Sequence, residues 1–324
     1  MQCNWGILGP GFIATRAILP ALHDTSVAHV LAVASRDAQR ASAVASQFNI
    51  ERTYTSYQAL IDDPDITIVY IALPNHLHRE WTIRAAQAGK HVLCEKPLAT
   101  SVTECDEMIA ACQQANILLM EAVMYRFHPR MIVLKHMLST GQLGEIRFLH
   151  AAFSFPFNAP NNYRAKPEYG GGALLDVGSY CINAVRWLIA SEPQSALSDI
   201  SYSHEIDITT SAILRFASTS SAAATTAHIQ CSFAAAEHQV IEVVGTEGAV
   251  TAPTAFTAWR ETPTELLIQR GNAFERRDFA PADPYQPMVE HFTQCALGKE
   301  TLRYPATDGR ETIRVLEMIR NAYL

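Results

Sequence analysis

The sequence has no C-x-x-C pair among its seven cysteines, which stand at positions 3, 94, 105, 112, 181, 231 and 295. Their number is odd and several lie inside apolar runs, which argues against a disulfide framework and against a cysteine-based zinc site. Disulfides persist mainly in oxidising compartments. The pattern therefore predicts reduced thiols in the core of a cytoplasmic protein.

Long apolar runs and clusters of positive charge are also missing. No segment is long enough to span a bilayer, and the strand-like run directly after Met1 leaves no room for a signal peptide. The 25 basic and 32 acidic residues give a formal net charge of −7. Nucleic acid and anionic membranes are therefore not expected as main partners. A chain of 324 residues, 48% of them hydrophobic, is long enough for two globular domains.

Short apolar runs alternate with helix-like segments through the first third of the chain. The strand-like runs are 4–9, 29–35, 66–73, 91–95 and 117–122, and the helix-like segments are 12–22, 37–48, 55–62, 77–89 and 101–115. Pro20 is expected to end or bend the first helix, and Asp37 to cap the second. Strands that are apolar throughout are typical of a parallel sheet covered on both faces. This part predicts an α/β Rossmann domain with a doubly wound parallel sheet, residues 1–122.

The pattern changes after about Val123. A helix is expected at 129–140, then a half-buried strand at 145–155 whose Ile146, Phe148 and His150 face the core, and a strong helix at 175–190. Further strand-like runs are 212–218, 222–233 and 238–252, and a last helix, 311–324, is free to pack on either domain. Strands grouped in this way predict an α+β domain on a mostly antiparallel sheet, residues 123–324. A cleft is expected between the two domains.

A glycine-rich turn follows the first strand. Gly9, Gly11 and Ala14 have the G-x-G-x-x-A spacing of dinucleotide-binding turns, and Phe12 and Ile13 lie within it. The first glycine permits the tight turn, the second lets the backbone approach a pyrophosphate, and the small third residue permits close helix packing. Strand, turn and helix stand in the order that this motif requires.

The end of the second strand indicates which nucleotide is bound. Ser35 and Arg36 stand where NAD enzymes usually carry an acidic residue, and Arg40 follows one helical turn later. A hydroxyl and guanidinium groups suit a 2′-phosphate, which favours NADP. NAD remains possible, because Asp37 is either a helix cap or the acidic residue shifted by two positions.

The loop after the 66–73 strand is the next candidate. Doubly wound sheets bind ligands at the carboxyl ends of their strands, so Asn75 and His76 are expected on the nicotinamide side. The other candidates for cofactor contacts in this loop are Leu73, Pro74 and His78. Two histidines without a nearby cysteine or carboxylate cluster do not make a metal site, and no metal is predicted.

The stretch HVLCEKPLAT, residues 91–100, ends a strand at Glu95, Lys96 and Pro97. Proline cannot donate to a sheet, so the strand ends there. An X-Pro bond is also the place where a cis peptide is least costly, and a cis bond turns the Lys96 side chain sharply. Taken alone, Lys96 is a solvated strand-end lysine or a group that faces the bound cofactor.

The stretch GGGALLDVGSY, residues 170–180, opens the strong helix of the second domain. Asp176 and Tyr180 stand four residues apart, on one face of a helix. Each has an ordinary structural explanation, because Asp favours helix starts and Tyr is often a core aromatic. Both together, behind three glycines and in a chain with a dinucleotide fold and Glu95-Lys96-Pro97, are harder to explain by structure alone.

With these motifs the sequence resembles the Gfo/Idh/MocA family, the glucose–fructose oxidoreductase, inositol dehydrogenase and rhizopine catabolism proteins. The resemblance covers nearly the whole chain, through the N-terminal turn, Glu95-Lys96-Pro97, the segment from Glu121 to Arg130 and the segment from Gly170 to Tyr180. It implies an NAD(P)-dependent oxidoreductase with Glu95, Lys96 and Pro97 at the cofactor. It also implies that Lys96, Asp176 and Tyr180 meet at the nicotinamide, and that a large open sheet forms a homodimer or homotetramer.

Many members of that family have histidine where this chain has Tyr180. With tyrosine at this position, the sequence resembles the branch of the family that contains D-xylose dehydrogenase and trans-dihydrodiol dehydrogenase. The expected substrate is therefore an aldose oxidised at C1, with a trans-dihydrodiol or another cyclic polyol as the alternative. We expect Tyr180 to move the hydroxyl proton, Lys96 to lower the pKa of Tyr180 and hold the substrate oxygen, and Asp176 to bond a sugar hydroxyl or orient Lys96.

Further substrate contacts are predicted from segments expected to face the cleft. The candidates are Arg126, Phe155, Tyr163 and Arg164, with His128 nearby. Arg164 is equally well explained as a surface arginine, and the stretch around Arg126 and His128 as packing at a helix start. Two other functions stay open: a non-catalytic NADP(H) sensor, and an enzyme that passes hydride between two sugars on a permanently bound cofactor.

Overall fold

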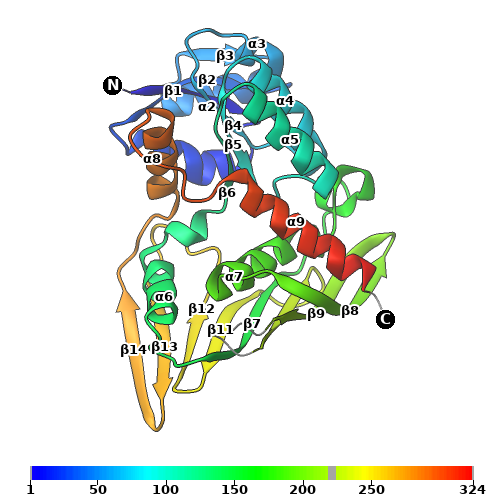
Figure 1. Ribbon diagram of the computed structural model, residues 1–324. Helices are drawn as coiled ribbons and strands as arrows, with labels where there is room; N and C mark the ends of the chain where they lie inside the picture. The colour runs from blue at the N-terminus through cyan, green and yellow to red at the C-terminus, as the bar shows by residue number, and fades with distance from the viewer. Residues whose placement is uncertain (1, 218–223, 323–324) are drawn as a thin grey trace. The chain divides into compact units, whose positions relative to one another are not determined.

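The computed structural model describes residues 2–217 and 224–322. The chain forms two compact units (Figure 1). The first comprises the chain up to Met124 together with Tyr285–Arg310, and the second comprises Tyr125–Pro284 together with the chain from Glu311 onward. The predicted division was into 1–122 and 123–324. In the structure the first boundary lies after Met124, and residues 285–310 return to the first unit.

The first unit is built on a six-stranded parallel sheet in the order β3-β2-β1-β4-β5-β6. Its strands are β1 (Cys3–Leu8), β2 (Ala28–Ala34), β3 (Arg52–Tyr54), β4 (Ile68–Ile71), β5 (His91–Glu95) and β6 (Leu119–Ala122). The predicted doubly wound sheet is confirmed. Chain order reverses at β1, which pairs with both β2 and β4, and such a reversal is where open α/β sheets bind ligands.

Helices connect these strands, and one further helix comes from later in the chain. The connecting helices are η1 (Ala14–Ile18), α1 (Leu19–His23), α2 (Ala38–Phe48), α3 (Tyr57–Ile61), η2 (Asn75–Leu77), α4 (His78–Gln87) and α5 (Val102–Gln114), and the later helix is α8 (Tyr285–Ala296). Pro20 was expected to end or bend the first helix. The helix does not end there but changes from π geometry in η1 to α geometry in α1 just before Pro20, which lies in the first turn of α1.

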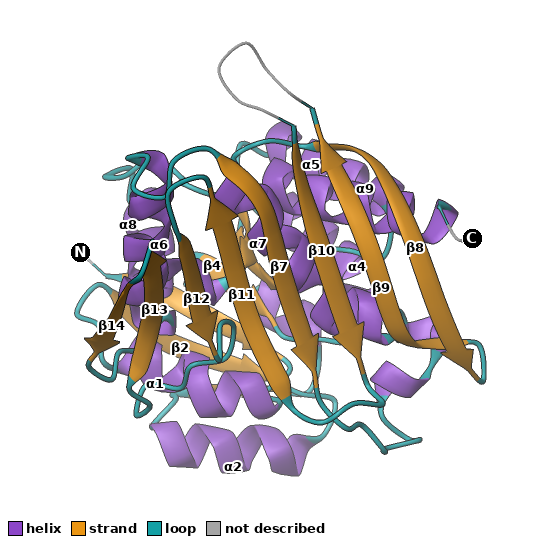
Figure 2. Cartoon of the chain, turned by 90° about the horizontal axis from the view of Figure 1, so that it is seen from below, coloured by secondary structure: helices purple, strands orange, loops and turns teal. Residues whose placement is uncertain are grey.

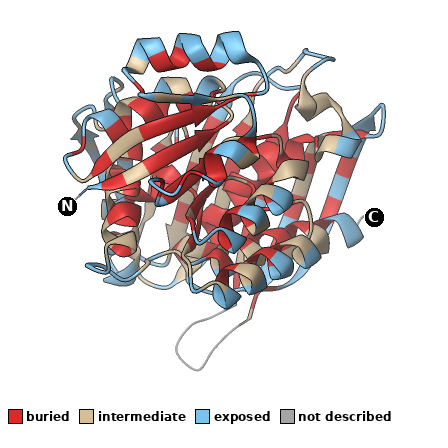
Figure 3. Ribbon diagram, turned by 90° about the horizontal axis from the view of Figure 1, so that it is seen from above, coloured by how far each residue is buried: buried red, intermediate tan, exposed pale blue. Residues whose placement is uncertain are grey.

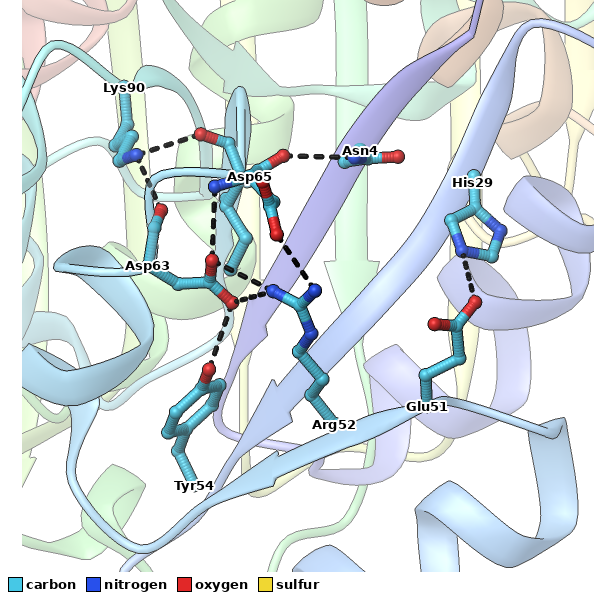
Figure 4. Close-up of polar contacts among 9 residues, drawn as sticks. Asn4, His29, Glu51, Arg52, Tyr54, Asp63, Asp65 and Lys90 are labelled. Carbon is cyan, nitrogen blue, oxygen red and sulfur yellow. Dashed lines mark hydrogen bonds and ion pairs between the residues drawn. The ribbon is translucent and has the colours of Figure 1, made fainter.

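Polar side chains anchor the loop before β4 (Figure 4). Arg52 donates to Asp63 at 2.7 Å and to Asp65 at 2.8 Å, and the Tyr54 hydroxyl donates to Asp63 at 2.9 Å. The ammonium of Lys90 donates to the Asp63 carbonyl oxygen at 2.7 Å. Burial raises the pKa of Asp63, but Arg52, the Asp65 N–H and Tyr54 together hold it below its ordinary value. The network ties β3 to the loop that leads into β4.

Buried residues of the first unit concentrate in its strands (Figure 3). Trp5 of β1 is fully buried and packs edge-on against Phe292 of α8, with ring centroids 6.0 Å apart. This contact shows why α8 belongs to the first unit although it follows the second in sequence. All seven cysteines of the chain are buried and free of disulfides, as predicted.

The second unit is built on an eight-stranded sheet in the order β14-β13-β12-β11-β7-β10-β9-β8 (Figure 2). Its strands are β7 (Ile146–Ser154), β8 (Pro193–Ser203), β9 (Ile206–Phe216), β10 (Thr225–Ser232), β11 (His238–Gly245), β12 (Ala249–Pro253), β13 (Thr264–Arg270) and β14 (Ala273–Phe279). β7 and β10 pair in parallel and the other pairs are antiparallel, which confirms the predicted sheet type. The parts of the predicted runs at 218, 222 and 223 lie outside the described residues.

Helices pack on one face of this sheet. They are η3 (Met124–Phe127), α6 (Pro129–Ser139), η4 (Tyr163–Ala165), η5 (Pro167–Tyr169), η6 (Leu174–Gly178), α7 (Ser179–Ile189) and the later part of α9 (Ala306–Asn321). The predicted end of the last helix at 323–324 lies outside the described residues. Figure 2 looks onto the other face, on which the second unit places no helix among its described residues.

The predicted orientation of β7 is wrong. Phe148 is 41% exposed, on the helix-free face, whereas Leu149, Ala151 and Phe153 are buried. Both alternating sets of this strand contain apolar residues, so period-two patterning could not decide which set faces the helices.

Within the described residues, no helix is long and apolar enough to cross a membrane.

Candidate functional site

Close packing explains the first glycine of the turn after β1 but not the second. A Cβ on Gly9 (φ +83°) would lie 2.7 Å from the Ala72 carbonyl oxygen and 2.7 Å from a Leu73 methyl carbon, so only glycine fits. A Cβ on Gly11 would meet no protein atom within 4 Å among the described residues. Protein packing therefore does not require glycine at position 11, whereas the close approach of a pyrophosphate does.

A pocket of about 610 Å³ lies between this turn and α2. Gly11 and Phe12 line it from the turn, and Asp37, Gln39 and Arg40 line it from the end of β2 and the start of α2. Asp37 acts as a helix cap, because its Oδ1 accepts the N–H groups of Gln39 at 2.9 Å and Arg40 at 3.1 Å. Arg40 therefore brings positive charge to a pocket whose nearest carboxylate is engaged by the backbone.

Other cofactor candidates surround this pocket or follow β4. Ser35 is buried, and its hydroxyl accepts the Asp37 N–H at 3.1 Å, while Arg36 is exposed. Ile13 precedes η1, and Leu73 and Pro74 connect β4 to η2. Asn75 is buried and His76 is half-buried in η2. These residues lie at the carboxyl ends of β1, β2 and β4, the edge on which ligands of this fold bind.

Lys96 stands directly after β5 in a turn with several anchors. The Lys96–Pro97 peptide bond is cis. The hydroxyl of buried Tyr70 donates to Oε1 of Glu95, and the Lys96 N–H donates to Oε2 of Glu95 at 3.2 Å. Oε1 of Glu121, on β6, accepts the Leu98 N–H at 2.7 Å. Side chains of β4, β5 and β6 thus stabilise the turn that carries Lys96 by hydrogen bonds.

His78 is placed differently from the other cofactor candidates. Its side chain is fully buried, with Nδ1 2.8 Å from the Pro97 carbonyl oxygen and Nε2 2.8 Å from the Leu73 carbonyl oxygen. Burial lowers the pKa of His78, and the charge of Lys96 lowers it further. With both nitrogens directed at the backbone, His78 contacts the loops of the site rather than a ligand.

In the second unit, Arg164 and Asp176 form an ion pair. Nε of Arg164 donates to Oδ2 of Asp176 at 2.6 Å, and the guanidinium lies over the Tyr163 ring, 4.8 Å from its centroid. The Asp176 side chain is 5% exposed and that of Arg164 29%. Burial lowers the pKa of Arg164, but Asp176, Tyr163 and Tyr180 outweigh it and raise the pKa above its ordinary value.

Tyr180 lies one turn beyond Asp176, at the start of α7. Its ring packs among those of Tyr125, Phe153 and Phe256, with centroids 5.5 to 6.1 Å away. Phe155 extends this aromatic cluster toward Phe233, at 5.2 Å. The second unit therefore brings Asp176, Tyr180, Phe155, Tyr163 and Arg164 into one region, beside aromatic surface.

Arg126 and His128 do not join that region as substrate contacts. Arg126 is 2% exposed, donates to the Asn183 carbonyl oxygen and lies over the Trp187 ring. This placement argues against the predicted substrate contact and assigns Arg126 to packing against α7. His128 caps α6, since its Nδ1 accepts the Arg130 N–H at 3.1 Å.

The sequence reasoning missed Asp207. This carboxylate, on β9, is buried and accepts the Leu174 N–H at 2.6 Å, at the start of the helix that carries Asp176 and Tyr180. A Cβ on Gly172 (φ +108°) would lie 2.1 Å from its Oδ1, so glycine is required there. Burial raises the pKa of Asp207 to about 6. The triple glycine suggested a special turn, but nothing local indicated its partner on β9.

One group of metal-type ligands lies elsewhere in the first unit, at His291, Cys295 and Glu300. Nδ1 of His291 lies 2.6 Å from Glu300, and Nε2 accepts the Arg303 N–H at 3.1 Å. Because Nε2 is an acceptor, the ring proton sits on Nδ1, where a metal would have to bind. The cluster joins α8 to the following loop by hydrogen bonds.

Two family models match the chain. The model of the oxidoreductase family with an NAD-binding Rossmann fold matches residues 3–123, and the model of the GFO/IDH/MocA C-terminal domain matches residues 131–251. The chain belongs to the GFO/IDH/MocA oxidoreductase family. The predicted resemblance, Rossmann domain and oxidoreductase class are confirmed.

Relatives span the full length of the chain. D-xylose 1-dehydrogenase (NADP(+)) 2 of Haloferax volcanii is 34% identical, covering 98% of this chain and 96% of the relative. Trans-1,2-dihydrobenzene-1,2-diol dehydrogenase of Xenopus laevis is 32% identical, covering 92% and 90%. The crystal structure of a 3-ketoreductase from Actinomadura kijaniata, in complex with NADP and TDP-benzene, is 30% identical with a TM-score of 0.90, covering 100% and 98%. The chain is thus similar to oxidoreductases that differ in substrate.

Proposed function

We propose that this oxidoreductase is an NADP-dependent sugar dehydrogenase that oxidises an aldose of the D-xylose type at C1. The observation that carries the proposal is the ion pair between half-buried Arg164 and buried Asp176, one helical turn from Tyr180. The pair offers a hydrogen-bond acceptor and a cationic donor, which suit the hydroxyl groups of a sugar. The similarity to D-xylose 1-dehydrogenase supports this choice of substrate class.

The pocket between Gly11 and Arg40 supports NADP as the cofactor. Gly11 leaves room for the pyrophosphate, and Arg40, which lines the pocket, supplies a guanidinium group for the 2′-phosphate. Exposed Arg36, next to Asp37 in the chain, is a second candidate for that contact. Asp37 is occupied as a helix cap, which argues against its use as an acceptor for an NAD ribose. Phe12, which is 72% exposed, offers apolar surface along the same pocket.

Tyr180 takes the proton of the substrate hydroxyl in the proposed reaction. When bound, the nicotinamide accepts the hydride from the carbinol carbon, so that the C1 hydroxyl of a cyclic aldose becomes the carbonyl of a lactone. An ordinary tyrosine has a pKa of about 10, too high for an efficient base near neutral pH. A neighbouring cation favours the phenolate. Arg164 supplies such a charge within the second unit, and Lys96 supplies the other in our proposal.

Each of these residues has its own role in substrate binding. Lys96 holds the reacting oxygen, Asp176 accepts a hydrogen bond from a neighbouring hydroxyl, and Arg164 donates to another hydroxyl as well as to Asp176. Tyr163 and Phe155 offer aromatic surface to the apolar face of the ring. These roles extend the family resemblance to the side chains of this chain.

A trans-dihydrodiol is the second candidate substrate. The aromatic cluster of Phe153, Phe155 and Phe233 favours a flat apolar ring, and the similarity to the dihydrodiol dehydrogenase points the same way. We place it second because a diol presents only two hydroxyl groups to the four polar side chains Lys96, Arg164, Asp176 and Tyr180.

The helix-free face of the second unit supports self-association. It carries Phe148, Leu197 and Ile213, exposed by 41%, 48% and 36%, around a depression of about 690 Å³. The described residues that line this depression include two acidic residues, Asp199 and Glu242, but no lysine or arginine, and its exposed apolar side chains are of the kind that form interface cores. We propose that a second copy of the chain covers this face and forms a homodimer or a homotetramer.

Lys96→Met and Tyr180→Phe test the catalytic assignment. Each is expected to lower kcat about 10²-fold to 10⁴-fold, the range for loss of a general acid–base group, while NADPH affinity stays within about threefold. Turnover is followed by NADPH absorbance and binding by nicotinamide fluorescence. Wild-type turnover in both variants would contradict the assigned roles.

A further inference from the structure

His78 joins two loops at the edge of the parallel sheet where Lys96 lies. It is the first residue of α4, and its imidazole is fully buried between the carbonyl oxygens of Leu73 and Pro97, each 2.8 Å from a ring nitrogen. A protonated ring donates to both oxygens and a neutral ring to one. In either state the rigid imidazole ring lies between the loop that contains Leu73 and the turn that contains Pro97, and contacts both.

The two contacts fall on residues next to functional groups. Pro97 follows Lys96 directly, so its carbonyl belongs to the turn that aims the lysine. Leu73 packs so closely on the glycine-rich turn that a Cβ on Gly9 would lie 2.7 Å from its Cδ2. His78 thus links the turn after β5 to the loop after β4, which packs against the turn after β1.

We propose that His78 is a positioning residue. It fixes the position of the turn that carries Lys96 relative to the glycine-rich turn, and thereby the position of the Lys96 ammonium group. It does not contact the reacting atoms itself. Glu121 is the second anchor of the same turn, through the Leu98 N–H. Because catalysis needs reacting groups held to within fractions of an ångström, loosening one anchor slows turnover without abolishing the fold. The inference rests on the proposed function, since it needs Lys96 in the reaction.

His91 provides the matched control. It begins β5, the strand that ends next to Lys96, and its Nδ1 accepts the Leu118 N–H at 3.0 Å. Both histidines bind the backbone of another segment, but His91 does so at the opposite end of the strand. Both substitutions remove an imidazole that contacts the backbone of another segment, two contacts for His78→Ala and one for His91→Ala, and only the first touches the Lys96 turn.

Two measurements on the full chain test the proposal. Amide hydrogen exchange of residues 95–99 is expected to rise at least about tenfold in His78→Ala and to stay unchanged in His91→Ala. In the same variants, kcat is expected to fall about 10-fold to 100-fold in His78→Ala, the range for loss of an outer-shell partner, and by less than threefold in His91→Ala. His78→Gln, which retains one amide donor, is expected to recover part of the loss.

Combination with Lys96→Met shows whether His78 acts through the lysine. The kcat of the double variant is expected to be no lower than that of Lys96→Met alone. If the fold-losses in kcat of the two single variants multiplied in the double variant, the proposal would be overturned. Unchanged exchange at 95–99, or faster exchange with unchanged kcat, would also overturn it. If the wild type turns over no sugar or diol while His78→Ala still raises exchange at 95–99, the proposed function fails and the positioning contact stands.

Discussion

The guanidinium of Arg164 lies 2.6 Å from the carboxylate of Asp176, and Asp176 is nearly inaccessible to solvent. Removing one partner of a buried pair leaves an uncompensated charge. Arg164→Met is therefore expected to destabilise the protein by about 2–4 kcal/mol and to raise the KM for the sugar. Chemical denaturation and initial-rate kinetics give the two quantities.

Lys166→Met is the control for Arg164, because Lys166 is a cation in the same loop that lies over the Tyr169 ring. It is expected to change stability by less than about 1 kcal/mol. The double variant Arg164→Met/Asp176→Asn is expected to recover stability but not the KM. If Arg164→Met matched Lys166→Met in both measurements, the pair would have no role in substrate binding.

Arg40 is expected to discriminate between the two nicotinamide cofactors. Arg40→Ala removes a charge-assisted contact to the 2′-phosphate, so the Kd for NADPH should rise about 10-fold to 100-fold while that for NADH changes little. Gln39→Ala is the control, because Gln39 lines the same pocket without a charge. Fluorescence titration with both cofactors measures the effect, and an equal loss for NADH would contradict recognition of the 2′-phosphate.

Much of the first unit could be predicted from the sequence because its signals are local. Strand β4 and the centre of β5 are apolar since both faces of the sheet are covered, and the G-x-G turn, Lys96 and the capping residue Asp37 act within a few residues of the chain. The three-residue strand β3 was missed because it is too short to show a pattern. Strand β14 was missed because most of its residues are exposed and four of them are charged.

Contacts between distant segments could not be predicted. Asp207 lies 33 residues from Leu174, whose N–H it accepts, and no spacing rule connects a strand to a helix start at that distance. The pairing of Arg164 with Asp176 and the burial of Arg126 likewise depend on how loops and helices pack. Motifs identified the reactive residues, and tertiary structure determined which side chains support them.

Asp207 gives the stability of the protein a distinct pH dependence. Its pKa of about 6 in the folded chain lies above its ordinary value of 3.8, so the folded state binds the proton more tightly than the unfolded state. Its contribution is fully present below about pH 4 and is lost as the pH rises through about 6, by about 3 kcal/mol in all. Asp207→Asn should remove this loss.

Denaturation of wild type and Asp207→Asn from pH 4 to pH 8 measures the difference. Asp63→Asn is the control, because the pKa of Asp63 is lowered and its contribution is lost only as the pH falls below about 4, so this substitution should not change the pH dependence between pH 4 and pH 8. Parallel curves for wild type and Asp207→Asn would show that Asp207 does not titrate in this range.

Self-association through the helix-free face is expected to depend on its apolar residues. Phe148→Asp combined with Ile213→Lys places charges at the centre of the proposed interface and should yield a monomer. Ile132→Asp is the control, since Ile132 is 50% exposed but lies on α6, which packs on the opposite face. Light scattering gives the masses, and an unchanged mass in the double variant would place the interface elsewhere.

The most direct measurement is NADP⁺ reduction by the purified wild type, followed by absorbance, with D-xylose, D-glucose, other aldoses and a trans-dihydrodiol as substrates. The proposed function predicts turnover with aldoses, most of all D-xylose, and lactone as the product. Turnover with the dihydrodiol alone would contradict the sugar assignment in favour of an apolar ring. No turnover with any of them, while NADPH still binds, would contradict both assignments and favour another polyol or a non-catalytic sensor.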